Sequence, residues 1–60
     1  STSDIKGFLK VFIEMERYAI DQYQELATKT HGKDLVTHEL AEDILTEEIA
    51  EEEEYENMLK

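Results

Sequence analysis

Apolar residues recur at steps of three and four along the first half of the chain. The recurring positions are Ile5, Leu9, Phe12, Ala19, Ile20, Tyr23 and Ala27. Because an α-helix completes a turn in about 3.6 residues, this spacing gathers them on one stripe of a helix over residues 4–30. Ile13 lies away from the centre of this stripe and is available for a contact beyond it.

The second half repeats the pattern, and a turn separates the two halves. A second stripe, over residues 35–59, is formed by Leu40, Ala41, Ile44, Tyr55, Met58 and Leu59. Before it, Gly32 suits the left-handed residue that follows a helix, and Asp34 suits the N-cap of the next helix, with Thr37 as an alternative cap. The sequence therefore predicts a first helix, a turn over residues 31–34 and a second helix.

A short connection makes consecutive helices antiparallel neighbours, so the predicted class is all-α and the fold of residues 1–60 is a two-helix hairpin. Two apolar stripes that face each other make only half of a bundle. A folded chain of this length hides about 60% of its unfolded surface, and without cysteine no disulfide adds stability. We therefore expect a homodimer or higher homo-oligomer that completes a four-helix bundle, or a hairpin that is half of a longer chain.

Charge is distributed unevenly along the chain. Residues 34–60 hold eleven acids against one base, Lys60, and account for the whole net charge of −10. Such a surface repels nucleic acid, and it either gathers cations or is simply a solvated helix face. No run of about 18 apolar residues predicts a membrane span, and no apolar leader is visible, so we expect a cytoplasmic protein.

Three glutamates interrupt the apolar stripes. Glu16 continues the three- and four-residue steps of the first helix, and Glu48 and Glu51 continue those of the second. Gly32 lies sixteen residues from Glu16 and sixteen from Glu48. In an antiparallel pair these side chains therefore meet at one level, roughly 20 Å from the turn.

A buried carboxylate without a partner is costly, and neighbouring carboxylates raise one another's pKa. A divalent cation offsets that cost most directly, while protonation or a hydrated polar core are the alternatives. An all-carboxylate set suits manganese, calcium or magnesium, so manganese or another divalent cation is a candidate.

Three segments resemble parts of the ferritin-like superfamily. Residues 16–23 resemble its metal-ligand helix, where a liganding glutamate precedes Ala-Ile and, further on, a tyrosine. Residues 32–40 resemble the turn and the start of the last bundle helix, and residues 44–53 resemble the segment that holds a Glu-x-x-His motif. The likeness is to the C-terminal helix pair of Dps-like and bacterioferritin-like di-iron proteins, and it covers roughly residues 5–60.

This resemblance implies a ferritin-like bundle around two irons, held by one glutamate from each of two helices and by Glu-x-x-His from the other two. By position, Glu16 matches the single glutamate, Glu48 matches the glutamate of the motif, and Tyr23 matches a tyrosine near the metals. Tyr55 is a second candidate beside the metals, since a buried hydroxyl needs a partner such as a carboxylate, and ordinary core packing is the alternative for both tyrosines. The implied activity is a ferroxidase that oxidises Fe(II) with oxygen or peroxide, for iron storage or protection from oxidative stress.

The chain departs from that motif at one position. Glu51 stands where the family has histidine, and neither His31 nor His38 replaces it, because both are expected at the surface. Two copies would then supply six carboxylates, whose charge of about −6 two divalent ions reduce to about −2. The alternative function is therefore a structural or oligomerisation module whose metal site is degenerate, weak or absent.

Overall fold

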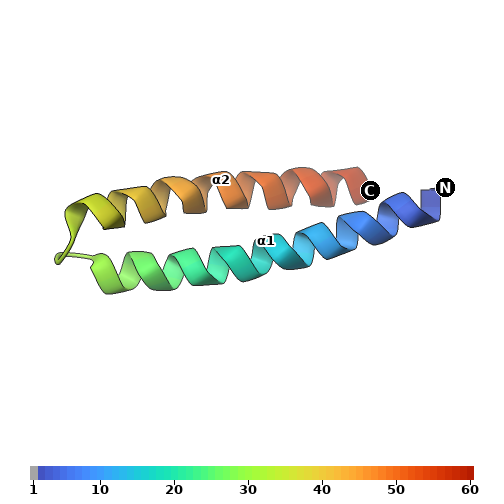
Figure 1. Cartoon of the computed structure of the whole chain (residues 1–60). Coiled ribbons are helices and arrows are strands. Elements are labelled where there is room, and N and C mark those ends of the chain that lie inside the picture. Colours follow the sequence, from blue (N-terminus) through green and yellow to red (C-terminus); the bar gives the residue numbers. More distant parts are fainter. Residues whose placement is uncertain (1) are drawn as a thin grey trace.

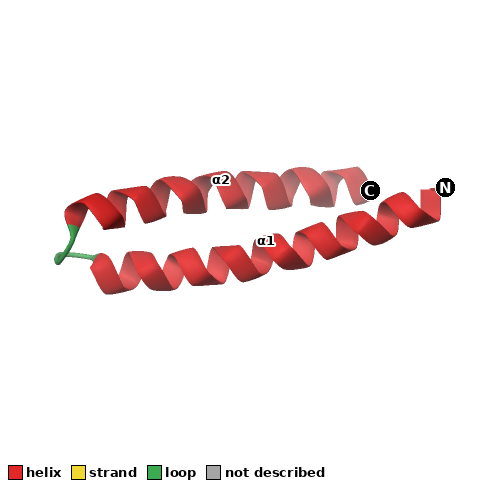
Figure 2. Ribbon diagram, in the orientation of Figure 1, coloured by secondary structure: helices red, strands yellow, loops and turns green. Residues whose placement is uncertain are grey.

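The computed structural model describes the backbone of residues 2–60 and the side chains of residues 4–60. Two helices, α1 (Thr2–Thr30) and α2 (Leu35–Leu59), lie antiparallel side by side and form a rod of 48 × 14 × 12 Å (Figure 1). The described residues otherwise form only the connecting turn and the chain end, which confirms the predicted all-α hairpin (Figure 2). Neither helix carries, within the described residues, an apolar stretch that would cross a membrane.

The turn is closed by backbone hydrogen bonds around one glycine. Gly32 has a φ of 71°, in the left-handed region that a residue with a side chain rarely adopts. The backbone N–H groups of Lys33 and Asp34 both donate to the carbonyl of Thr30, at 3.0 Å each. These hydrogen bonds satisfy a backbone carbonyl group that has no partner inside α1. They also stabilise the turn, in which the chain reverses its direction within a few residues.

Asp34 caps α2, as its position predicts. Its backbone is extended (φ −134°, ψ 92°), and its side chain accepts from the backbone N–H of Thr37 at 3.1 Å. Thr37 was the alternative cap, but it lies inside α2 and donates its hydroxyl to Asp34 at 2.6 Å. Both bonds favour the ionised carboxyl and lower the pKa of Asp34.

The contact between the helices buries little. Among residues 4–60, the buried residues are Leu9, Ile13 and Ala41. The expectation for Ile13 was wrong, since its side chain is only 5% exposed and packs between the helices. The apolar stripe predicted for α1 was centred too far from α2. The prediction had grouped residues that face α2 together with neighbouring residues that α2 does not cover.

Candidate metal centre

Three glutamates converge midway along the hairpin. α1 supplies Glu16, and α2 supplies Glu48 and Glu51, which lie one turn apart. One carboxylate oxygen of each residue lies within 4.8 Å of the other two. The helical steps and the distance from the turn, read from the sequence, placed these residues at one level, and the structure brings them together there.

Glu16 contributes a buried oxygen to this carboxylate cluster. Its Oε2 atom is buried and has no hydrogen-bond partner among the described residues. A hydrogen bond shared with Glu48, then burial, then repulsion from Glu48 and Glu51 raise the pKa of Glu16 from 4.5 to about 7. The cluster therefore holds a proton near neutral pH unless a cation takes its place.

The donor set fits a divalent cation. Carboxylate oxygens are the ligands of hard divalent ions, and binding such an ion would satisfy a buried carboxylate oxygen that has no hydrogen-bond partner. Glu16 and Glu48 are half-buried and Glu51 is exposed, so one edge of the cluster opens to the surface. In the described part of the chain, no other group of three histidine or acidic side chains comes this close together.

A comparison with known protein families matches residues 1–60 to the family described as ferritin-like domain. The chain belongs to the ferritin-like family. The resemblance inferred from residues 16–23 and 44–53 is thereby confirmed. No curated protein and no solved structure matches the chain.

Two of the three tyrosines of this ferritin-like chain, Tyr23 and Tyr55, differ in their relation to the cluster. The Tyr55 ring packs on Phe12, with centroids 5.7 Å apart. Burial and then the negative charges of Glu51 and Glu16 raise the pKa of Tyr55, so its hydroxyl lies in the field of the cluster. Tyr23 is half-buried, and within residues 4–60 it makes no hydrogen bond to the three glutamates.

The two histidines lie near the turn end of the hairpin, away from Glu16, Glu48 and Glu51. His31 is exposed, as expected. The expectation for His38 was wrong, because its side chain is only 17% exposed and contacts both Ala27 and Glu42. Its distance from the apolar stripe was read as solvent exposure, although that side of α2 faces the end of α1.

Sequence reasoning missed the role of Arg17, which follows Glu16 on α1. The Arg17 guanidinium reaches across to α2, 2.8 Å from Glu56 and 3.7 Å from Glu52. The signal was present, since Glu52 and Glu56 are one turn apart and can share one arginine. This ion pair ties the two helices together close to the carboxylate cluster.

Proposed function

We propose that the chain is a ferritin-like dimetal-carboxylate protein that handles iron in the cytoplasm, by Fe(II) oxidation with storage or protection from oxidative stress. The observation that carries the proposal is the buried oxygen of Glu16, which lacks a partner inside a carboxylate cluster of a ferritin-like chain. Glu16, Glu48 and Glu51 would hold the metal. When bound there, iron would supply the electron transfer to oxygen or peroxide.

The proposed working unit is a pair of chains. One hairpin supplies three carboxylates, whereas a ferritin-like dimetal site uses six ligand side chains. Large apolar side chains also stay exposed on the side of the hairpin where the cluster opens, namely Phe8, Phe12, Met15, Leu26, Leu40 and Met58. A second copy would cover these residues and complete both the bundle and the ligand set.

The chain's own residues set the proton balance of metal uptake. Because the pKa of Glu16 is about 7, this carboxyl is largely protonated in mildly acidic solution. A metal ion binds the ionised form, so binding below pH 7 displaces a proton. Tyr55 would hydrogen-bond a ligand oxygen beside the glutamates, a role supported by the effect of their charges on its pKa.

The test is metal binding by calorimetry and native mass spectrometry, with Fe(II) under anaerobic conditions and with Mn(II). We expect two ions per pair of chains in the wild type, and loss of that binding in Glu16→Gln and Glu48→Gln. Glu53→Gln is the matched control, because it removes one exposed charge from α2 outside the cluster. Equal binding by Glu16→Gln and wild type would overturn the proposal. If the protein bound Mn(II) but not Fe(II), the proposed metal site would stand and the proposed iron chemistry would be wrong.

A second candidate is a structural helical module that binds no metal. The observation in its favour is Glu51 at the motif's histidine position, which removes the imidazole that transition metals prefer. A proton on Glu16 then offsets part of the charge. This candidate predicts a higher melting temperature for Glu16→Leu and no metal binding by the wild type. A lower melting temperature would count against it.

A further inference from the structure

Arg17 bridges the two helices at the level of the carboxylate cluster. It directly follows Glu16 on α1, and one of its two partners, Glu52, directly follows Glu51 on α2. The Nη2 atom of Arg17 donates a hydrogen bond of 2.8 Å to a Glu56 carboxylate oxygen, and its Nε atom lies 3.7 Å from a Glu52 oxygen. An attraction between the helices therefore lies directly beside the cluster.

The cluster itself pushes the helices apart at this level. Glu16 belongs to α1, whereas Glu48 and Glu51 belong to α2, so the carboxylates repel one another across the contact between the helices. Bonds between divalent ions and carboxylate oxygens are only about 2.0–2.6 Å long. A small outward movement of α1 would therefore carry Glu16 out of reach of an ion that the other two hold.

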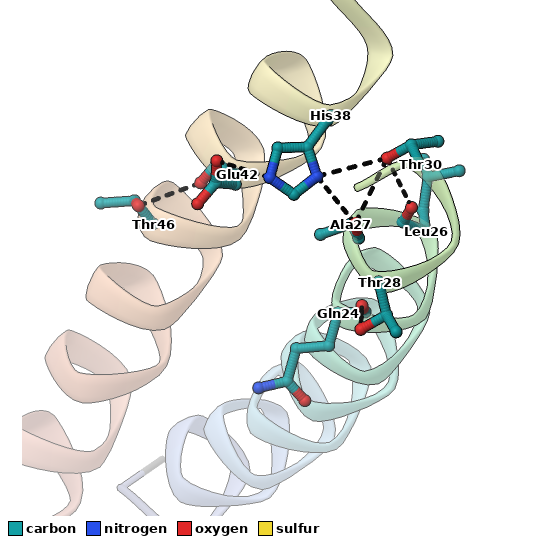
Figure 3. Close-up of polar contacts among 8 residues, drawn as sticks. All are labelled: Gln24, Leu26, Ala27, Thr28, Thr30, His38, Glu42 and Thr46. Carbon is teal, nitrogen blue, oxygen red and sulfur yellow. Dashed lines mark hydrogen bonds and ion pairs between the residues drawn. The ribbon is translucent and has the colours of Figure 1, made fainter. Parts of the chain in front are cut away.

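Contacts elsewhere in the hairpin do not fix the separation at the cluster. At the turn end, Nδ1 of His38 lies 2.7 Å from the carbonyl oxygen of Ala27, in the last turn of α1 (Figure 3). Ala27 is eleven residues from Glu16, which is about 16 Å along a helix. Ile13 packs between the helices nearer the cluster, but apolar packing is non-directional and sets no particular carboxylate position.

We propose that Arg17 is a positioning residue of the candidate metal centre, a role that rests on the proposed metal-binding function. Through Glu56 and Glu52 it holds α1 against α2, which keeps the carboxylate of Glu16 beside those of the other two ligands. Arg17 does not bind the ion itself, because a guanidinium is a cation and offers no lone pair. The affinity for metal thus depends on a residue outside the ligand set.

The bridge lies on the side of the hairpin away from the exposed part of the cluster. Glu51 and Glu56 are five residues apart on α2, and Phe12 and Arg17 are five residues apart on α1. At about 100° per residue, the members of each pair are about 140° apart around their helix. Glu51 and Phe12 belong to the side that a second chain would cover. Substitutions at Arg17 and Glu56 therefore leave that side unchanged.

The bridge is too exposed to contribute much to stability. The side chains of Arg17 and Glu56 are 60% and 41% exposed, and water screens an ion pair of this kind. Its loss should change the melting temperature of the metal-free protein by less than about 5 °C. A large effect on metal affinity with a small effect on melting would therefore separate positioning from general stability.

Calorimetric titration of the full 60-residue chain with Mn(II), at pH 8 and physiological salt, tests the role. Arg17→Gln and Glu56→Gln break the same bridge but change the local charge in opposite directions. We expect both to bind Mn(II) about fivefold more weakly than wild type, the most that an exposed ion pair contributes. Lys29→Gln is the control, because Lys29 pairs at 2.8 Å with Glu25 inside α1 and links no second helix.

A charge-reversed pair tests for rescue. Arg17→Glu combined with Glu56→Arg keeps the net charge and restores an ion pair between the helices, so it should recover most of the lost affinity. If Arg17→Gln binds Mn(II) more tightly and Glu56→Gln more weakly, charge alone acts and the positioning role is wrong. Affinities equal to wild type, or a loss of affinity that follows a large fall in melting temperature, would also overturn it. If wild type binds no metal, the proposed function fails and the positioning role fails with it.

Discussion

Glu16 shows how a single residue can work against the stability of its fold. Its carboxyl lies close to those of Glu48 and Glu51, and one of its oxygens is buried without a partner. The folded protein therefore binds a proton on Glu16 more tightly than the unfolded chain does, with a pKa of about 7 in place of 4.5. A residue with this cost is retained most simply where a ligand removes it.

The raised pKa of Glu16 predicts the pH dependence of the metal-free protein. Because the folded-state pKa is raised, stability is full below about pH 4.5 and is lost as the pH rises toward about 7. Glu16→Gln keeps the shape without the charge, so it should remove most of this decline and raise the melting temperature at pH 8 by about 5 °C. Thermal unfolding from pH 4.5 to 8.5, with chelator present, measures it.

Adding Mn(II) or Fe(II) at pH 8 should reverse the decline in the wild type and leave Glu16→Gln unchanged, because the ion takes the place of the proton. If wild type and Glu16→Gln show the same pH profile, Glu16 is solvated and the raised pKa is not realised. The other charge contributions, such as the ionised Asp34 cap, are common to both proteins.

Residue-level prediction succeeded where helical steps determine position. The three glutamates were found because the spacing of a helix fixes which side chains share a face, and the glycine turn fixes their level along the hairpin. His38 was missed because its burial depends on the carbonyl end of α1, and Arg17 because a long side chain reaches beyond its own helical position. Contacts that depend on where a neighbouring helix ends cannot be read from the periodicity of one helix.

At the scale of the elements, the turn glycine carries a clear prediction. Gly32 has a φ of 71°, and a Cβ built there meets nothing within 4 Å, so any cost of Gly32→Ala comes from the backbone alone. We expect a loss of about 1–2 kcal/mol in the free energy of unfolding. Gly7 lies inside α1 with equally open space, and there alanine should add about 0.5–1 kcal/mol.

Urea unfolding of Gly32→Ala and Gly7→Ala at one protein concentration checks both signs. Opposite signs would show that the left-handed turn, and not chain flexibility in general, requires glycine at residue 32. If Gly32→Ala proved neutral, the turn would have another conformation open to it, and the placement of α2 against α1 would depend on side-chain contacts instead.

The sequence predicted correctly that each helix carries an apolar stripe, but it did not predict where the centre of the buried stripe lies. An apolar stripe tells which side of a helix is buried, but not how that burial is divided between two neighbours. Leu9 and Ile13 pack between the helices, while Phe8 and Met15 remain exposed. The sequence contains both sets, and only the position of α2 separates them.

At the scale of the whole molecule, the exposed apolar side of the hairpin is the main cost to stability that a single chain does not offset. The described side chains of the hairpin include only three buried residues. Such a small core does not bury enough apolar surface to stabilise a single chain. The side of α2 that bears Glu51 also bears Leu40 and Met58, both more than half exposed. One covering chain would bury that surface and bring a second set of three carboxylates to the first.

A pair of variants on opposite sides of α2 tests this assembly. Leu40 and Ile49 are nine residues apart, which at about 100° per residue places them on opposite sides of the helix. Their side chains are 58% and 43% exposed in the hairpin, so Leu40→Lys and Ile49→Lys disturb the isolated chain to a similar, small extent. In a dimer that buries the glutamate-bearing side, only Leu40→Lys places a charge in an apolar contact, which costs several kcal/mol.

Sedimentation equilibrium should therefore give the mass of one 7.0 kDa chain for Leu40→Lys and of a dimer or larger assembly for wild type and Ile49→Lys. Metal binding should fall together with assembly in Leu40→Lys, although residue 40 is about two turns from Glu48 and touches no ligand. If Leu40→Lys stays assembled and Ile49→Lys dissociates, the chains pair through the other side of α2. The two sets of glutamates would then face away from each other, and a six-carboxylate site could not form.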